Sequence, residues 1–267
     1  MTQPFVDAEV NRTKSKWVAN VFKEFGKSKT TLRSLFYFAL SRAEPDYPIC
    51  GGFVGEIRVT RPYHESDGLK LSKWVGKARE IGYVPKDAIL EEVPGEHIFI
   101  NPSEKDAKQK IELWINKSAL NLLLLPICKK LGLNLVSVQS RPTDMAINAL
   151  LERAKSEAII ISCLSNLSSS DFLFAEDLTQ IVLASIKDQY QQNIQIRKMG
   201  LTPQQVIDLG ITMVQAEKAE KHRQDRYKKY LKPYGLDPKR MAELDALEVY
   251  YSKGISGFVE DKLRELV

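Results

Sequence analysis

Short apolar segments alternate with amphipathic segments through the second half of the chain, and this alternation restricts the possible folds more than any other feature. Four segments have the length and apolar content of strands: 111–115, 133–138, 158–164 and 194–199. Three segments between them have the spacing of helices: 118–131, 143–156 and 176–191. Apolar strands that alternate with helices are typical of a parallel sheet with both faces covered. We therefore predict an α/β domain over residues 111–267.

The first half of the chain has a different pattern. A first helix carries an apolar stripe from Trp17 to Phe25 and ends at Gly26. Thr30 or Thr31 can cap a second helix that runs through Leu40. The Pro- and Gly-rich segment 44–55 follows and is predicted to be a loop.

A third helix follows Ser66 or Asp67, either of which can cap it, and Gly82 ends it. Segment 82–100 then predicts two short strands around a turn at Pro94–Gly95. Three helices and a β-hairpin are the order of a winged helix-turn-helix. We therefore expect an α/β protein with four parts: a flexible N-terminus (1–13), a winged helix-turn-helix domain of α+β type (14–103), a charged linker (104–110) and the parallel-sheet domain (111–267).

Composition excludes several classes of protein. Apolar residues make up 43% and charged residues 27% of the 267 residues, which argues against a disordered chain. The longest apolar runs are far shorter than the roughly 20 residues of a membrane helix. The N-terminal residues lack an apolar signal core, so we expect a cytoplasmic protein with no membrane partner. Three Cys and three His residues do not suffice for a disulfide framework or a Cys/His zinc site, and the Cys residues are expected to be buried thiols.

Positive charge is concentrated in two segments. Residues 1–42 carry eight Lys or Arg residues against three Asp or Glu residues, and residues 195–240 carry eleven against five. Two basic segments on a nearly neutral body suggest a polyanionic partner, with nucleic acid first. Solvated helix faces would give the same pattern, and charge alone leaves both interpretations open.

The third helix adds a clue to DNA binding. Lys70, Lys73 and Lys77 are three or four residues apart, so they share one face opposite the apolar stripe. A helix that enters a DNA groove needs cations that neutralise phosphates. Arg61 and Arg79 are further candidates for DNA contacts. An ordinary solvated lysine face is the alternative.

Several motifs, in order, resemble a known family. In the second half they are WINKSAL (114–120), IISCLSNLSSSDF (160–172), IRKMGLTPQQVIDLGI (196–211) and AELDAL (242–247). In the first half they are TLRSLFYFAL (31–40) and LSKWVGKAREIGYVPKDAI (71–89). This sequence resembles proteins that join a winged helix to a Toprim domain, as in the topoisomerase VI A subunit and its meiotic double-strand-break relatives. The resemblance implies a homodimer that holds duplex DNA.

The resemblance also implies a magnesium site built from one Glu and two Asp residues. At the matching positions this sequence has Asn116, Asn166 and Ser168, while Lys117 and Ser170 are retained. Neutral amides and hydroxyls lack the charge that attracts a divalent ion, so we expect no metal and no other cofactor.

Two further groups of acidic residues lie close to these positions in the sequence. A relocated metal site that includes Asp171, Glu176 and Asp177 is conceivable, although acidic residues in the first turn of a helix also favour its dipole. Glu243 and Asp245 match the late motif, where structural bonding is the expected role.

Tyr37 is a candidate nucleophile. The resemblance places it where the relatives carry the tyrosine that attacks DNA, after Arg33 in the Arg-x-x-Phe-Tyr spacing. A tyrosine nucleophile needs deprotonation and a metal that stabilises the transition state, and without the carboxylates this sequence lacks the second part. Packing in the helical core is the alternative.

These observations favour a non-catalytic protein that binds double-stranded DNA through its winged helix, with the Toprim-like domain as scaffold or dimer surface. A DNA-cleaving transesterase or nuclease, which would use Tyr37 or a relocated Mg²⁺ site, is one alternative. A protein-interaction subunit of a DNA-processing complex is another. The basic segment 217–233 could follow a phosphate backbone or be ordinary charged surface.

Overall fold

The computed structural model describes residues 9–101, 109–139, 141–185 and 193–264. The chain divides into two compact units, residues 1–91 (unit 1) and 92–267 (unit 2). Both units combine helices with strands, and both contain parallel strand pairs, so the predicted α/β class is confirmed. No helix in the described ranges is both long and apolar enough to cross a membrane.

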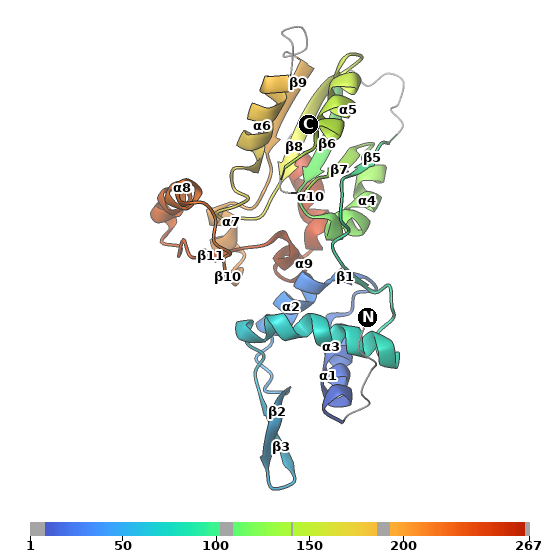
Figure 1. Cartoon of the computed structure of the whole chain (residues 1–267), viewed down its shortest axis with the longest axis vertical. Coiled ribbons are helices and arrows are strands. Elements are labelled where there is room, and N and C mark those ends of the chain that lie inside the picture. Colours follow the sequence, from blue (N-terminus) through green and yellow to red (C-terminus); the bar gives the residue numbers. More distant parts are fainter. Residues whose placement is uncertain (1–8, 102–108, 140, 186–192, 265–267) are drawn as a thin grey trace. The chain divides into compact units, whose positions relative to one another are not determined.

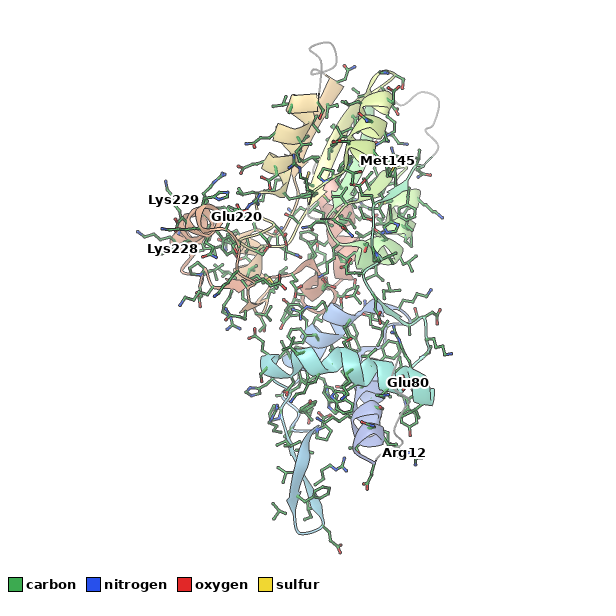
Figure 2. The ribbon with its side chains drawn as sticks, viewed as in Figure 1. Arg12, Glu80, Met145, Glu220, Lys228 and Lys229 are labelled. Carbon is green, nitrogen blue, oxygen red and sulfur yellow. The ribbon has the colours of Figure 1, made fainter. Side chains whose placement is uncertain are left out.

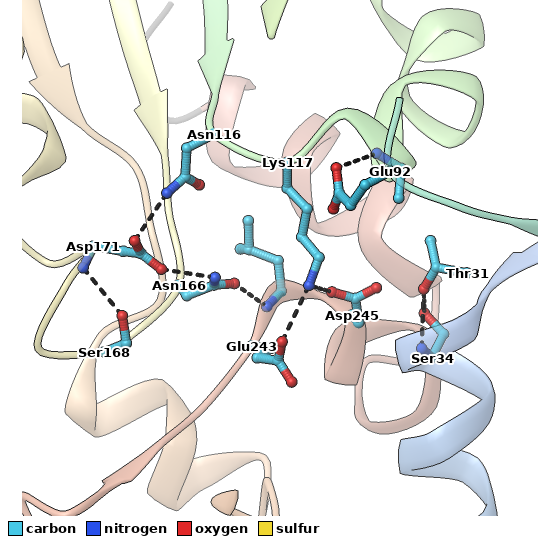
Figure 3. A network of polar contacts seen from close by, with 12 residues as sticks. Thr31, Ser34, Glu92, Asn116, Lys117, Asn166, Ser168, Asp171, Glu243 and Asp245 are labelled. Carbon is cyan, nitrogen blue, oxygen red and sulfur yellow. Dashed lines mark hydrogen bonds and ion pairs between the residues drawn. The ribbon is translucent and has the colours of Figure 1, made fainter. Parts of the chain in front are cut away.

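Three helices form the body of unit 1: α1 (Glu9–Phe25), α2 (Leu32–Ser41) and α3 (Gly68–Ile81), the last preceded by the short 3₁₀ helix Glu65–Asp67. Thr31 caps α2, because its hydroxyl accepts a hydrogen bond from the backbone N–H of Ser34 at 3.0 Å (Figure 3). Gly82 ends α3 in the left-handed conformation, with φ of 83°. The three predicted helices are therefore confirmed, and residues 9–13, predicted to be flexible, are helical.

The prediction of a loop over residues 44–55 is wrong for most of that segment. Strands β2 (Tyr47–Val54) and β3 (Ile57–Arg61) pair antiparallel and form a hairpin that extends away from the three helices (Figure 1). Gly55 has a φ of 61°, which a two-residue hairpin turn requires. The sequence did not predict this hairpin, because Gly and Pro residues, which are rare in strands, are clustered in β2.

The two strands after α3 exist, but they do not pair with each other as predicted. Strand β4 (Ile89–Leu90) pairs parallel with β1 (Thr30–Thr31) in unit 1. Strand β5 (His97–Phe99) pairs antiparallel with β7 (Asn134–Ser137) of unit 2 and covers what would otherwise be an open sheet edge. The first unit therefore ends before β5, whereas the predicted domain ran to residue 103. Most of the predicted linker lies outside the described residues.

Unit 2 contains a five-stranded sheet in the order β5-β7-β6-β8-β9. Its four parallel strands confirm the predicted sheet: β6 (Gln109–Ile115), β7 (Asn134–Ser137), β8 (Ala158–Leu164) and β9 (Ile194–Lys198). The predicted helices are present as α4 (Asn121–Lys130), which follows the 3₁₀ helix Ser118–Leu120, α5 (Asp144–Ala154) and α6 (Phe174–Ser185). The predicted end of the last helix, from residue 186, lies outside the described residues.

Helices cover both faces of this sheet. On one face α5 and α6 bury a core that includes Trp114, Ile161 and Cys163. On the other, α4 packs on β7, and the C-terminal helix α10 (Gly254–Arg264) packs on α4. The thiols of Cys128 and Cys163 are buried, as predicted, and burial raises the pKa of each to about 12. The side chain of Cys50 is not among those that the structure describes.

The chain between β9 and α10 adds short elements beside the sheet. In order these are α7 (Pro203–Asp208), β10 (Val214–Gln215), α8 (Lys221–Leu231), the 3₁₀ helix Lys232–Tyr234, β11 (Arg240–Met241), the 3₁₀ helix Leu244–Ala246 and α9 (Leu247–Tyr250). Strands β10 and β11 pair antiparallel. Helix α8 lies within the basic segment 217–233.

A buried carboxylate holds β6 to its neighbours. Glu112 is fully buried, and its oxygens accept hydrogen bonds from Arg153 of α5 at 2.7 and 3.0 Å. They also accept from Trp114 at 2.8 Å and from Asn134 of β7 at 2.9 Å. A buried charge with this many donors is compensated, whereas its loss would leave the Arg153 guanidinium without an anionic partner.

Glu112→Gln should therefore lower the free energy of unfolding by about 3 kcal/mol, because it breaks a buried pair. Urea denaturation followed by circular dichroism measures this change. The matched control is Glu152→Gln, since Glu152 is exposed and its pair with Lys155 should contribute less than about 1 kcal/mol. Equal effects from the two variants would contradict the assigned role of Glu112.

Candidate functional site

The residues predicted from the Toprim resemblance meet at the carboxyl edge of the sheet. Strand β6 connects to β7 on one side, and β8 connects to β9 on the other, so the strand order reverses between β6 and β8. In open α/β sheets, ligands bind at such a reversal, beyond the carboxyl ends of the strands. Asn116 follows β6, and Asn166 follows β8, so the fold places both at this point.

Asp171 joins the two Asn side chains. The amide nitrogen of Asn116 donates to one carboxylate oxygen of Asp171 at 3.0 Å, and that of Asn166 donates to the other at 2.9 Å (Figure 3). The backbone N–H of Asp171 donates to the Ser168 hydroxyl at 3.1 Å, and this hydroxyl contacts that of Ser170 at 2.9 Å. Four of the five predicted Toprim positions, all except Lys117, thus lie in one network with Asp171. We call it the Asp171 network, and its members are Asn116, Asn166, Ser168, Ser170 and Asp171.

This donor set does not fit Mg²⁺. The ion requires anionic oxygen ligands, but Asn116 and Asn166 present N–H donors, and these donors already bond to both oxygens of Asp171. Within the described ranges, no group of three or more His, Cys, Asp or Glu side chains is arranged to hold a metal ion. We derive no metal-dependent step from this edge.

The acidic residues considered as a relocated metal site have other partners. Glu176 pairs with Arg226 at 2.7 Å, and Asp177 pairs with Arg223 at 2.7 Å. Both arginines belong to α8, so these acidic residues join α6 to α8. The arrangement favours a structural role over metal binding.

Lys117 lies between two carboxylates of the late motif. Its ammonium group is 3.1 Å from Glu243 and also forms an ion pair with Asp245, whose side chain is fully buried. Burial alone would lower the pKa of Lys117, but the two carboxylates outweigh it and raise that pKa well above 10.5. The motifs pointed to Lys117, Glu243 and Asp245 separately. Their pairing could not be predicted, because local sequence patterns do not show that residues so far apart in the chain come together.

The five candidate DNA contacts of unit 1 have different environments. Arg61 binds both carboxylate oxygens of Asp67 at 2.7 and 2.8 Å, and Arg79 binds Glu91 at 2.5 Å. Lys77 pairs with Glu80 at 2.8 Å. The remaining two, Lys70 and Lys73, are exposed, and neither forms an ion pair with a described residue.

Tyr37 is fully buried. Its ring lies edge-on to Phe36 at 5.5 Å between centroids, and the Arg33 guanidinium is 5.6 Å from the centre of the ring. A nucleophile must reach the atom that it attacks, so this environment favours the packing interpretation of Tyr37.

Asp171→Asn tests the Asp171 network. One of its two oxygens becomes an N–H₂ group that faces another donor, so we expect a loss of about 1–3 kcal/mol in the free energy of unfolding. Asp208→Asn is the control, because Asp208 is exposed and bonds only to Gln204 among the described residues. An Asp171→Asn variant as stable as the control would show that the network contributes little.

Comparison with known proteins gives no family. No family model matches this sequence, and a search of curated proteins also finds no match.

Proposed function

We propose that this protein is a non-catalytic, duplex-DNA-binding protein of the winged-helix–Toprim type, which contacts DNA through α3. The observation that carries the proposal is the exposed N-terminal half of α3, where Lys70 and Lys73 lack ion-pair partners among the described residues. Leu69, 96% exposed, and Ser72 lie beside them. The opposite face is buried through Leu71, Trp74 and Val75.

This surface has the chemistry of a helix that lies in the major groove. The first turns of such a helix contact base edges, and lysines beside them neutralise phosphates. An exposed leucine can contact a thymine methyl group, and a serine can donate to or accept from a base edge. Leu69 is therefore available for such an apolar contact.

Unit 2 would then serve as scaffold and dimer surface. The Toprim resemblance implies a homodimer on duplex DNA, and the Asp171 network replaces charge with neutral amides where the relatives bind Mg²⁺. The proposal therefore includes no cofactor and no cleavage. A cleaving enzyme that uses Tyr37 would first have to bring this buried residue to the surface.

The double variant Lys70→Glu/Lys73→Glu should weaken duplex binding at least tenfold and reduce the salt dependence by about two phosphate contacts. Fluorescence anisotropy of a labelled duplex across a salt series measures both quantities. The control is Lys129→Glu/Lys155→Glu, which makes the same charge change at the C-terminal ends of α4 and α5. Equal losses in the two variants would indicate non-specific attraction, and no binding by the wild type would refute the proposal.

A second candidate function, as a protein-interaction subunit, is favoured by the β2–β3 hairpin. Its tip exposes Phe53, Val54 and Ile57 by 53%, 72% and 75%. Exposed apolar groups on a projecting arm are more typical of a contact surface than of free solvent. The first partner to consider is a second copy of the chain.

Phe53→Ser/Ile57→Ser should convert a dimer to a monomer in sedimentation equilibrium if the hairpin tip joins two copies. Because both side chains are exposed, the variant should unfold at the same urea concentration as the wild type. An unchanged mass would remove the support that the hairpin gives to self-association.

A further inference from the structure

A cavity of about 360 Å³ lies between the end of β9, the segment after β8, and helices α6 and α8. Its lining residues are Phe172, Glu176, Lys198, Arg226, Lys229 and Tyr230. Lys198 is the last residue of β9, and Phe172 directly follows Asp171. The cavity, which we call the α6–α8 cavity, therefore opens near the carboxyl edge of the sheet, where α/β folds place their ligands.

The walls of this cavity are fixed. The hydroxyl of Tyr227, a buried residue of α8, donates to the carbonyl of Leu167 at 2.9 Å and lies 3.2 Å from that of Arg240. Arg223 donates to the carbonyl of Ser170 at 3.0 Å. These bonds hold α8 against the segment after β8, so a ligand would not have to order the site on binding.

Three cations face one carboxylate in the cavity. Arg226 is paired with Glu176 at 2.7 Å, and the charge of Glu176 also acts on Lys198, while neither Lys198 nor Lys229 forms an ion pair with a described carboxylate. The Lys198 ammonium donates to the carbonyl of Phe172 at 2.8 Å and lies 5.0 Å from the centre of the Tyr230 ring. Desolvation lowers the pKa of Lys198, and the nearby charge of Glu176 only partly offsets this effect.

Lys229 sits on the outer part of this site. Figure 2 shows Lys228 and Lys229 as side chains that project from α8. Lys221 is the first residue of α8, and Lys232 begins the 3₁₀ helix that follows it. Neither lysine forms an ion pair with a described residue. An anion in the cavity would therefore lie within a wider positive surface, which attracts polyanions.

We propose that the α6–α8 cavity binds a phosphate group of a nucleic-acid backbone through Lys198, Arg226 and Lys229. A phosphate has several anionic oxygens, so it can accept from cations that reach it from β9 and from two turns of α8 at once. The aromatic rings of Phe172 and Tyr230 hold Lys198 in place. The choice of nucleic acid as the source rests on the proposed function, whereas the choice of phosphate rests on the cavity alone.

Amine acylation of the full chain, read by mass spectrometry, tests the site. A short DNA duplex should slow acylation of Lys198 and Lys229 severalfold, and single-stranded DNA and inorganic pyrophosphate are the comparison probes. Lys129 and Lys155 are the internal controls, since they lie at the far ends of α4 and α5. Protection by pyrophosphate but by neither DNA would support the phosphate site and overturn its assignment to nucleic acid.

Two variants with opposite expected effects complete the test. Lys198→Met/Lys229→Met should weaken duplex binding about tenfold and reduce its salt dependence by about one phosphate contact. Glu176→Gln should strengthen binding severalfold, because Glu176 is the one carboxylate among the described residues that line the cavity. DNA binding that depends on Lys70 and Lys73, without protection of Lys198 and without change in either variant, would overturn the cavity proposal and leave the proposed function intact. Absence of protection by any probe would also overturn it.

Discussion

The buried charge of Lys117 is the constraint on which the carboxyl edge of unit 2 depends. Glu243 and Asp245 neutralise it, and they come from a segment more than one hundred residues later in the chain. Asn166 adds a second link, because its side-chain oxygen accepts from the backbone N–H of Leu244 at 2.9 Å. Since the pKa of Lys117 is raised in the folded state, this stabilisation is present below pH 10.5 and is lost only as the pH rises through the folded value. Removal of the Lys117 ammonium would take away the cation that two buried carboxylates share, whereas removal of either carboxylate would still leave the other to pair with Lys117.

Much of the fold could be predicted from the sequence because it depends on local patterns. Segment 158–164 is apolar throughout, as a central strand of a parallel sheet must be, and its predicted bounds match β8. Thr31 and Gly82 carry cap signals, and α2 and α3 begin and end beside them. The pairing of β5 could not be predicted in this way. His97–Phe99 has a strand pattern, but whether it pairs with β4 or with β7 depends on which open edge is within reach.

The candidate site shows the same division. Position in the motif identified Asn116 and Asn166, and the strand order explains why they meet. The role of Asp171 was not predicted. A carboxylate close to positions where the metal ligands are replaced suggests a relocated metal site, whereas in the structure Asp171 accepts hydrogen bonds from two amides. Likewise, nothing in the sequence separated Lys70 and Lys73 from Arg61 and Arg79. The acidic partners that neutralise the two arginines, Asp67 and Glu91, become visible only when the chain is folded.

The place of β5 has a practical consequence for any attempt to prepare the two units separately. A fragment that ends at residue 103 would take His97–Phe99 away from β7 and leave the backbone groups of that strand without partners. An open strand at the end of a sheet is a template for association between molecules, so the remaining fragment would tend to aggregate. A division between residues 91 and 92 keeps all five strands of the sheet together.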